Sequence, residues 1–276
     1  MRIVNLMENT EGAPGCIFQH GLSFYVETAK HKIVVDAGPS ADFLENAKTL
    51  GIDLKKVDAL ILSHGHYDHS GGILPFTECN PDAKIYLQAS ALREYYAFDG
   101  EELGYRYIGI DKEIAKLPGA VLLSGDTRLD EELSLFVMDQ NRHPVPSTNR
   151  RILEKVDGEY VKDGFRHEQA LVVQAEGKRL VFSGCAHNGI LNVMETYVRK
   201  YGEEPDLVVS GFHLMKKTEY REEQLEEIDE IAKNLLNYKK TKFYTCHCTG
   251  IPAYERMKAI MGEKLTYVHA GEEIGL

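Results

Sequence analysis

The chain has 276 residues, of which 43% are hydrophobic, and its formal net charge is -11 at pH 7. A chain of this length and apolar content buries a large core, and we expect a single domain over residues 1–276. The negative charge disfavours a general nucleic-acid-binding surface, and no run approaches the roughly 20 apolar residues of a membrane span. Because the N-terminus is too interrupted for a signal sequence and the five cysteines form no regular framework, we expect a cytoplasmic protein with reduced thiols.

Short apolar segments at residues 3–7, 23–27 and 32–36 predict the opening strands. A loop rich in Gly and Pro separates the first two of these strands. Residues 40–50 then carry apolar side chains at helical spacing, with Ser40 as the expected N-cap. We therefore expect a helix that covers one face of a sheet.

The segment that carries the chemistry is residues 63–72, in which three histidines and one aspartate occupy six consecutive positions, His64-Gly65-His66-Tyr67-Asp68-His69. It follows an apolar run, residues 57–62, that predicts a buried strand. Alternate side chains of an extended segment point the same way, so His64 and His66 can converge while Asp68 and His69 lie further round the turn. Imidazole and carboxylate are ligands of zinc, iron and manganese. The pattern predicts a site for two neighbouring metal ions, and a polar surface turn is the alternative.

His64-x-His66-x-Asp68-His69 after an apolar strand resembles the metal motif of the metallo-β-lactamase superfamily. Further segments resemble the branch of it that contains the archaeal dihydropterin ribofuranosylaminobenzene phosphate synthase: Gly21-Leu22-Ser23, Asp36-Ala37-Gly38, Ser183-Gly184-Cys185-Ala186-His187, Gly211-Phe212-His213-Leu214 and His247-Cys248-Thr249-Gly250. The resemblance implies an α+β fold, an αββα sandwich of two mixed β-sheets flanked by helices, with the metals at one edge. It also implies that Asp36 supports the metal loop through hydrogen bonds. His20 is expected near the site, with an ordinary loop histidine as the alternative.

The middle of the chain carries weaker signals. Residues 84–87 predict a strand, and residues 95–107 carry five aromatic side chains that line a substrate entrance or pack in a core or flap. Asp126 follows a strand and a glycine, as the bridging aspartate of the superfamily does. It precedes the third histidine motif in the chain, however, so we favour a turn carboxylate.

Residues 139–167 show the least regular pattern and predict a flap over the site, with a solvated loop as the alternative. Arg150 and Arg151 in this segment are candidate donors to a substrate phosphate, because guanidinium binds phosphate through two parallel hydrogen bonds.

Residues 169–174 and 179–182 predict two paired strands joined by a Glu-Gly turn. His187 follows the second strand, and the resemblance implies that it is the third ligand of the first metal. His167, which precedes the hairpin where other members carry a metal histidine, is its competitor. Cys185 stands where the wider superfamily often has its bridging aspartate. A thiolate can bind zinc, but we favour a small buried side chain.

The last third of the chain predicts a strand at residues 206–210, an amphipathic helix within residues 219–239 and a strand at residues 242–245. His213 follows the first of these strands. It either contacts the substrate and donates a proton or is a structural strand-end histidine. His247 follows the last strand, and we expect it to complete the second metal site.

Six residues form the expected ligand set, three to each of two divalent ions: His64, His66 and His187 for the first, and Asp68, His69 and His247 for the second. We expect zinc, with iron and manganese as alternatives. Metal binding lowers the pKa of a water molecule from about 15.7 to about 7. The resulting hydroxide attacks a carbonyl or phosphorus atom while the ions stabilise the oxyanion. Asp68 is also expected to orient this nucleophile.

The sequence thus predicts a metal-dependent hydrolase acting on an ester, amide or phosphoester bond of a small molecule, with a phosphorylated molecule as one candidate. A transferase is the first alternative, since the resemblance to the pterin synthase implies the transfer of a methylene carbon to an arylamine. A non-catalytic, metal-bound ligand sensor is the second. Neither the substrate nor the oligomeric state follows from the sequence.

Overall fold

The computed structural model describes residues 1–275 and divides the chain into two compact units. Unit 1 comprises Met1–Thr127, Arg151–Gln169 and the residues from Val268 onward, and unit 2 comprises Arg128–Arg150 and Ala170–Tyr267. Each unit has its own buried apolar core, and the single domain expected from the length stays a prediction. Within the described part of the chain, no helix has both the length and the apolar character needed to cross a membrane.

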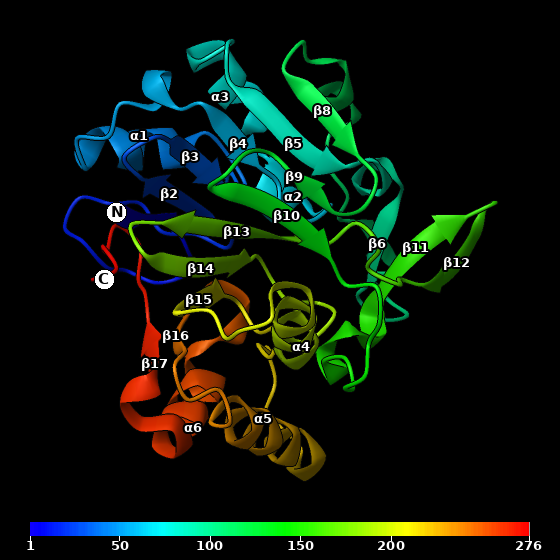
Figure 1. Cartoon of the computed structure of the whole chain (residues 1–276). Coiled ribbons are helices and arrows are strands. Elements are labelled where there is room, and N and C mark those ends of the chain that lie inside the picture. The colour runs from blue at the N-terminus through cyan, green and yellow to red at the C-terminus, as the bar shows by residue number, and fades with distance from the viewer. Residues whose placement is uncertain (276) are drawn as a thin grey trace. The chain divides into compact units, whose positions relative to one another are not determined.

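The main sheet of unit 1 has six strands in the order β1-β2-β3-β4-β5-β8 (Figure 1). The strands are β1 (Arg2–Met7), β2 (Ser23–Glu27), β3 (Lys32–Val35), β4 (Ala59–Ile61), β5 (Lys84–Gln88) and β8 (Ala120–Leu123). β1, β2 and β3 pair antiparallel, whereas β3, β4, β5 and β8 pair parallel. The sheet is therefore mixed, and the strands expected from the apolar segments are confirmed. Because β3 and β4 are parallel, with Val35 opposite Ile61, the loops that follow them begin at the same edge.

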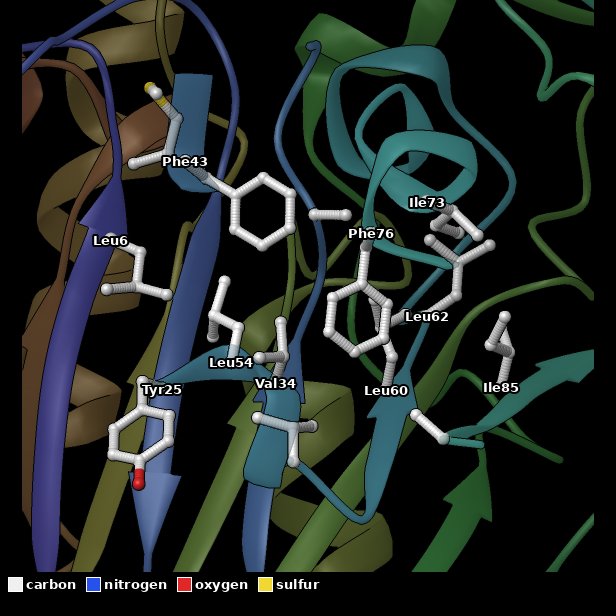
Figure 2. Close-up of a cluster of buried hydrophobic side chains, with 14 of the residues drawn as sticks. Leu6, Tyr25, Val34, Phe43, Leu54, Leu60, Leu62, Ile73, Phe76 and Ile85 are labelled. Carbon is white, nitrogen blue, oxygen red and sulfur yellow. The ribbon is translucent and has the colours of Figure 1, made fainter. Parts of the chain in front are cut away.

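Helices α1 (Asp42–Thr49), α2 (Tyr67–Ser70) and α3 (Ile73–Cys79) belong to this unit. Figure 2 shows that Phe43 of α1 and Phe76 of α3 extend into one apolar cluster with strand side chains such as Leu60. The two phenylalanine rings lie 6.4 Å apart, and each fully buried side chain of this size contributes about 1.5–3 kcal/mol. The expected helix at residues 40–50 is confirmed, but Ser40 is not its N-cap residue. The helix begins after Ala41, and the Ser40 hydroxyl accepts a hydrogen bond from the backbone N–H of Asp42.

A second sheet of unit 1 has four strands in the order β12-β11-β6-β7, all antiparallel. They are β6 (Tyr95–Phe98), β7 (Tyr105–Tyr107), β11 (Ile152–Val156) and β12 (Glu159–Lys162). The aromatic stretch therefore supplies two strands, and Tyr105 stacks on Tyr160 with ring centroids 3.7 Å apart. The expected flap at residues 139–167 contains η4 (Ser147–Arg151), β11 and β12, and its mobility stays a prediction.

The residues from Val268 onward return to the first strand. The backbone N–H of Asn5 donates to the carbonyl of Glu272, and the N–H of Ile274 donates to the carbonyl of Ile3, both at 2.9 Å. These hydrogen bonds cover the outer edge of β1, which is the edge strand of its sheet.

The sheet of unit 2 has the order β17-β16-β15-β14-β13-β10-β9 (Figure 1). The strands are β9 (Thr127–Arg128), β10 (Leu133–Val137), β13 (Gln169–Ala175), β14 (Lys178–Ser183), β15 (Leu207–Ser210), β16 (Lys242–Thr245) and β17 (Leu265–Tyr267), and the helices are α4 (Ile190–Tyr201), α5 (Glu222–Leu235) and α6 (Ile251–Met261). β13 and β14 form the expected antiparallel hairpin, and β14 to β17 are parallel. Ser183, Ser210 and Thr245 lie side by side in register. The loops after these three strands therefore start at one edge of the sheet.

Candidate metal centre

The histidines of the motif converge in unit 1, in the turn between β4 and α2. His64 and His69 are fully buried, and His66 and Asp68 are nearly so. The ring centroids of His64 and His66 are 4.6 Å apart, and those of His64 and His69 are 4.1 Å apart. The alternation expected for an extended segment therefore brings these imidazoles together, with α2 beginning at Tyr67 to carry the last two residues of the motif.

Asp36 supports this turn through hydrogen bonds, as the resemblance implied. Its carboxylate accepts from the backbone N–H and from the hydroxyl of Ser63, each at 2.7 Å, and from Nδ1 of His69 at 2.6 Å. Because a carboxylate only accepts, Nδ1 of His69 carries the hydrogen and Nε2 carries the lone pair that binds metal. The Ser63 hydroxyl also lies 2.9 Å from Nδ1 of His64. Asp36 adopts a φ of 59°, a left-handed conformation that aspartate tolerates better than most residues.

His167 is buried beside the same turn, and both of its ring nitrogens are hydrogen-bonded. Nδ1 accepts from the backbone N–H of Gly65 at 2.9 Å, and Nε2 lies 3.0 Å from the Asp163 carboxylate. Although His66, Asp163 and His167 offer ligand atoms within 4.8 Å of one another, these bonds occupy the lone pair of His167. They favour a positioning role for His167 over the ligand role that we weighed against His187.

The glycines of the motif are required by close packing. A Cβ atom at Gly72 would lie 2.2 Å from the carbonyl oxygen of Ala37, and one at Gly71 would lie 2.1 Å from that of Pro39. His20 lies near this part of the chain as expected, because its Nε2 is 3.2 Å from the Asp68 carboxylate.

Two imidazoles of the turn, those of His64 and His66, lie in surroundings that favour their neutral form. Burial lowers the pKa of His64 well below its usual range, and the neighbouring His69 and His66 lower it further. Burial, and then His167, lower the pKa of His66 to about 3. Neutral imidazole is the form that binds a metal ion.

In unit 2, three histidines follow three adjacent parallel strands. His187 follows β14, His213 follows β15 and His247 follows β16. His187 and His247 are buried, and the rings of His187 and His213 lie 4.1 Å apart. Both His213 and His247 have positive φ, 51° and 50°, a conformation that costs free energy and is often found at functional sites.

Asn149 is a residue of this site that the sequence did not indicate. Its Nδ2 donates to the carbonyl of His187 at 2.7 Å, and its Oδ1 lies 3.0 Å from Nδ1 of the same histidine. Since the amide nitrogen is committed to the carbonyl, Oδ1 accepts from Nδ1–H and Nε2 carries the lone pair. Asn149 therefore holds His187 in the tautomer that a metal ion requires.

Three of the candidates considered for the site lie outside these groups. Asp126 is exposed and belongs to none of the groups of potential metal ligands found in residues 1–275. Arg151 pairs with Asp99 at 3.3 Å, so a phosphate would compete with that carboxylate. Arg150 is exposed.

The donor set of each unit fits a divalent ion of the zinc, iron or manganese class. Nδ1 of His69 donates to the Asp36 carboxylate, and Nδ1 of His187 donates to the Asn149 amide oxygen. The lowered pKa values of His64 and His66 favour their neutral forms. Nitrogen lone pairs on buried imidazoles, beside a nearly buried carboxylate, are the ligands that these ions accept.

The chain is similar in sequence and in structure to several known proteins. Residues 17–234 match the sequence profile of the family described as Metallo-beta-lactamase superfamily. An uncharacterized protein of Methanocaldococcus jannaschii is 29% identical over 269 residues, 94% of each chain. The 7,8-dihydropterin-6-methyl-4-(beta-D-ribofuranosyl)-aminobenzene-5'-phosphate synthase of the same organism is 29% identical over 93% of this chain and 90% of its own. The crystal structure of Tm1679, described as a metal-dependent hydrolase of the beta-lactamase superfamily, has a TM-score of 0.84 and 30% identity, over 100% of this chain and 99% of its own.

Proposed function

We propose a function from the premise that this chain belongs to the metallo-β-lactamase superfamily. It is a metal-dependent enzyme with the fold of that superfamily, with mixed sheets and flanking helices. Within the superfamily, we propose that it hydrolyses an ester, amide or phosphoester bond of a small molecule. The observation that carries this proposal is the set of buried histidines held by hydrogen bonds in the metal-binding tautomer.

The proposed centre holds two divalent ions, zinc in the first place and iron or manganese as alternatives. Its ligands are those expected from the sequence: His64, His66 and His187 for one ion, and Asp68, His69 and His247 for the other. When bound, the two ions supply Lewis acidity and a nucleophile at neutral pH. Asp36 and Asn149 support this assignment, because each orients one ligand histidine within its own unit.

Asp68 and His213 have the further roles that we propose for the chemical step. Asp68 accepts a hydrogen bond from the attacking water and orients it, and its contact with Nε2 of His20 at 3.2 Å limits the positions of its carboxylate. His213 contacts the substrate and donates a proton to the leaving group. Its half-buried imidazole keeps access to solvent, as a proton donor requires.

Two relatives favour two different reactions. Tm1679, at 30% identity over nearly the whole length, is described as a metal-dependent hydrolase, and this likeness supports hydrolysis. The second M. jannaschii relative, also 29% identical, is named as an aminobenzene phosphate synthase of pterin chemistry. This likeness keeps a transferase as the second candidate. A non-catalytic sensor is the third, and the retention of oriented ligands argues against it.

We propose a small-molecule substrate, with neither nucleic acid nor a membrane as partner. A phosphorylated substrate is a candidate, and of the two arginines considered, Arg150 is the better donor because Arg151 already pairs with Asp99. We also propose a reducing compartment, the cytoplasm, because none of the cysteines in the described part of the chain forms a disulfide bond.

The test measures metal content and turnover on the same preparations. We expect about two tightly bound ions per chain in the wild type and a clear loss of metal in His66→Ala. Matched samples are then assayed with ester, amide and phosphoester substrates, and in parallel with dihydropterin pyrophosphate and aminobenzene ribosyl phosphate. Metal-dependent release of a hydrolysis product supports the hydrolase, and formation of the coupled pterin supports the transferase. Full turnover of metal-free protein would contradict both.

A further inference from the structure

Two cysteines and a histidine of unit 2, none of them in the ligand set proposed above except through the roles weighed for His213, form a compact group. One of them, Cys185, also lies within 4.8 Å of the ligand atoms of His187 and His247. The ligand atoms of Cys185, His213 and Cys248 all lie within 4.8 Å of one another. Both cysteines are buried, and neither forms a disulfide bond. A pair of buried thiols beside an imidazole has the donor atoms of a site for a soft metal ion.

The parallel strands bring these three residues together. Cys185 follows β14, His213 follows β15, and Cys248 lies in the short helix η5 (His247–Thr249) after β16. The backbone N–H of His213 donates to Sγ of Cys248 at 3.3 Å, which holds the sulfur in place. A Cβ atom at Gly211 would lie 2.4 Å from the same sulfur, so the glycine at this position makes room for it.

Hydrogen bonds fix the position of the Cys248 sulfur beside the loop that follows β14. The thiol of Cys248 donates to the carbonyl oxygen of Cys185, with Sγ 3.7 Å from that oxygen. Metal ions bind the thiolate rather than the thiol, so an ion bound here replaces the hydrogen-bonded proton.

We propose that Cys185, His213 and Cys248 form an additional site for one soft divalent cation of the zinc class, next to the histidine ligands that follow the same strands. Two thiolates neutralise the charge of the ion, and the neutral imidazole is the third ligand, which leaves a fourth position for water or substrate. Tetrahedral zinc with its usual bond lengths places such ligand atoms about 3.5–3.8 Å apart. The three ligand atoms here lie within 4.8 Å of one another, so small side-chain movements bring them to these separations.

The additional site keeps the substrate contact proposed for His213, but an ion bound to this imidazole takes the place of the proton donation proposed for it. An imidazole has two ring nitrogens, so one binds the ion while the other remains available for a hydrogen bond. Binding of the ion releases the thiol protons to solvent, and affinity therefore rises with pH.

Cobalt titration of the reduced, metal-depleted full chain tests this site, because thiolate ligation gives a sulfur-to-cobalt charge-transfer band that imidazole and carboxylate ligands do not give. We expect one equivalent of this band in the wild type. In Cys248→Ser, the affinity for cobalt read from this band should fall by more than about 100-fold, which exceeds the usual effect of losing a residue that only supports a ligand. His213→Ala should lower the cobalt affinity as well. His66→Ala, which removes a ligand of the other centre, and Cys79→Ser, a half-buried thiol elsewhere, keep it.

A second measurement needs no variant. Zinc at one equivalent should slow the alkylation of Cys185 and Cys248 by about tenfold or more, read by peptide mass spectrometry with Cys79 as the internal reference. The proposal is overturned by absence of the band, by unchanged alkylation, or by oxidation of the pair to a disulfide in place of metal binding. A band that survives in Cys248→Ser but is lost in Cys185→Ser and in His64→Ala also overturns it, because Cys185 then belongs to the other centre.

Discussion

Replacing Asp36 by asparagine changes one side-chain atom, the one that determines the tautomer of His69, a proposed metal ligand. The Asp36 carboxylate accepts three hydrogen bonds, two from Ser63 and one from Nδ1 of His69. In Asp36→Asn, the oxygen opposite the Ser63 N–H is kept, but an NH2 group faces the other two donors. His69 then relieves the conflict by moving its proton to Nε2, the nitrogen proposed to bind metal. Asparagine also tolerates the φ of 59° at this position, so the backbone strain is unchanged.

The magnitude follows from the loss of the orienting group. Outer hydrogen-bond partners of metal ligands contribute about 10- to 100-fold to metal affinity, which equals about 1.4 to 2.8 kcal/mol. The metal-free protein should also lose stability, because Asp36 and His69 are fully buried and hydrogen bonds to a charged group contribute about 1.5–3 kcal/mol each. We therefore expect Asp36→Asn to fold, to bind metal 10- to 100-fold more weakly and to unfold at lower urea concentration.

Metal affinity is measured by competition with a chelator, and stability by urea unfolding of metal-free samples. Asp111→Asn is the matched control, since Asp111 is an exposed carboxylate that accepts a backbone hydrogen bond from Glu113 at 2.9 Å. A folded Asp36→Asn variant with the metal affinity of the wild type would refute the role assigned to this carboxylate.

Four further changes test other parts of the site. His167→Ala should lower the free energy of unfolding of the metal-free protein by about 3 kcal/mol, because it removes the donor facing the buried Oδ2 of Asp163; urea titration measures this. Asn149→Ala should weaken metal binding by about 10- to 100-fold, measured by calorimetric titration, and full affinity would contradict its orienting role. Because burial lowers the pKa of His66 to about 3, this histidine gains a proton only on unfolding below about pH 6.5. The contribution of His66 to the stability of the metal-free protein is thus complete above about pH 6.5 and is lost by up to about 1.4 kcal/mol per pH unit toward pH 3, and His66→Gln should remove this part of the slope. Gly72→Ala should cost about 1–3 kcal/mol by overpacking, whereas Gly164→Ala, with open space around it, should change little.

The strands and helices that bury one face could be predicted from the sequence. The apolar runs before Asp36 and His64 and the hairpin before His187 have the patterns of buried strands, and the structure has β3, β4, β13 and β14 there. These strands matter for the site because its side chains follow their ends. The motif of residues 63–72 could be found for the same reason, since its donors are neighbours in sequence.

The remaining features depend on contacts that local patterns do not encode. β7 is exposed along its whole length and β12 along most of it, so neither shows the alternation of a half-buried strand. Asn149 acts on a histidine 38 positions away, and its type alone does not distinguish an orienting amide from a turn residue. The meeting of Cys185 and Cys248 likewise depends on the register of parallel strands.

The pairing of residues 271–274 with β1 has a consequence for biosynthesis. A nascent chain presents β1 with one edge unpaired from the time β2 forms until residues 271–274 have left the ribosome. Unpaired strand edges promote association between chains, so this interval is the period of greatest exposure to misassembly. A version that lacks the residues after Val268 would retain that exposed edge permanently, and we expect it to aggregate during expression although every proposed metal ligand is present.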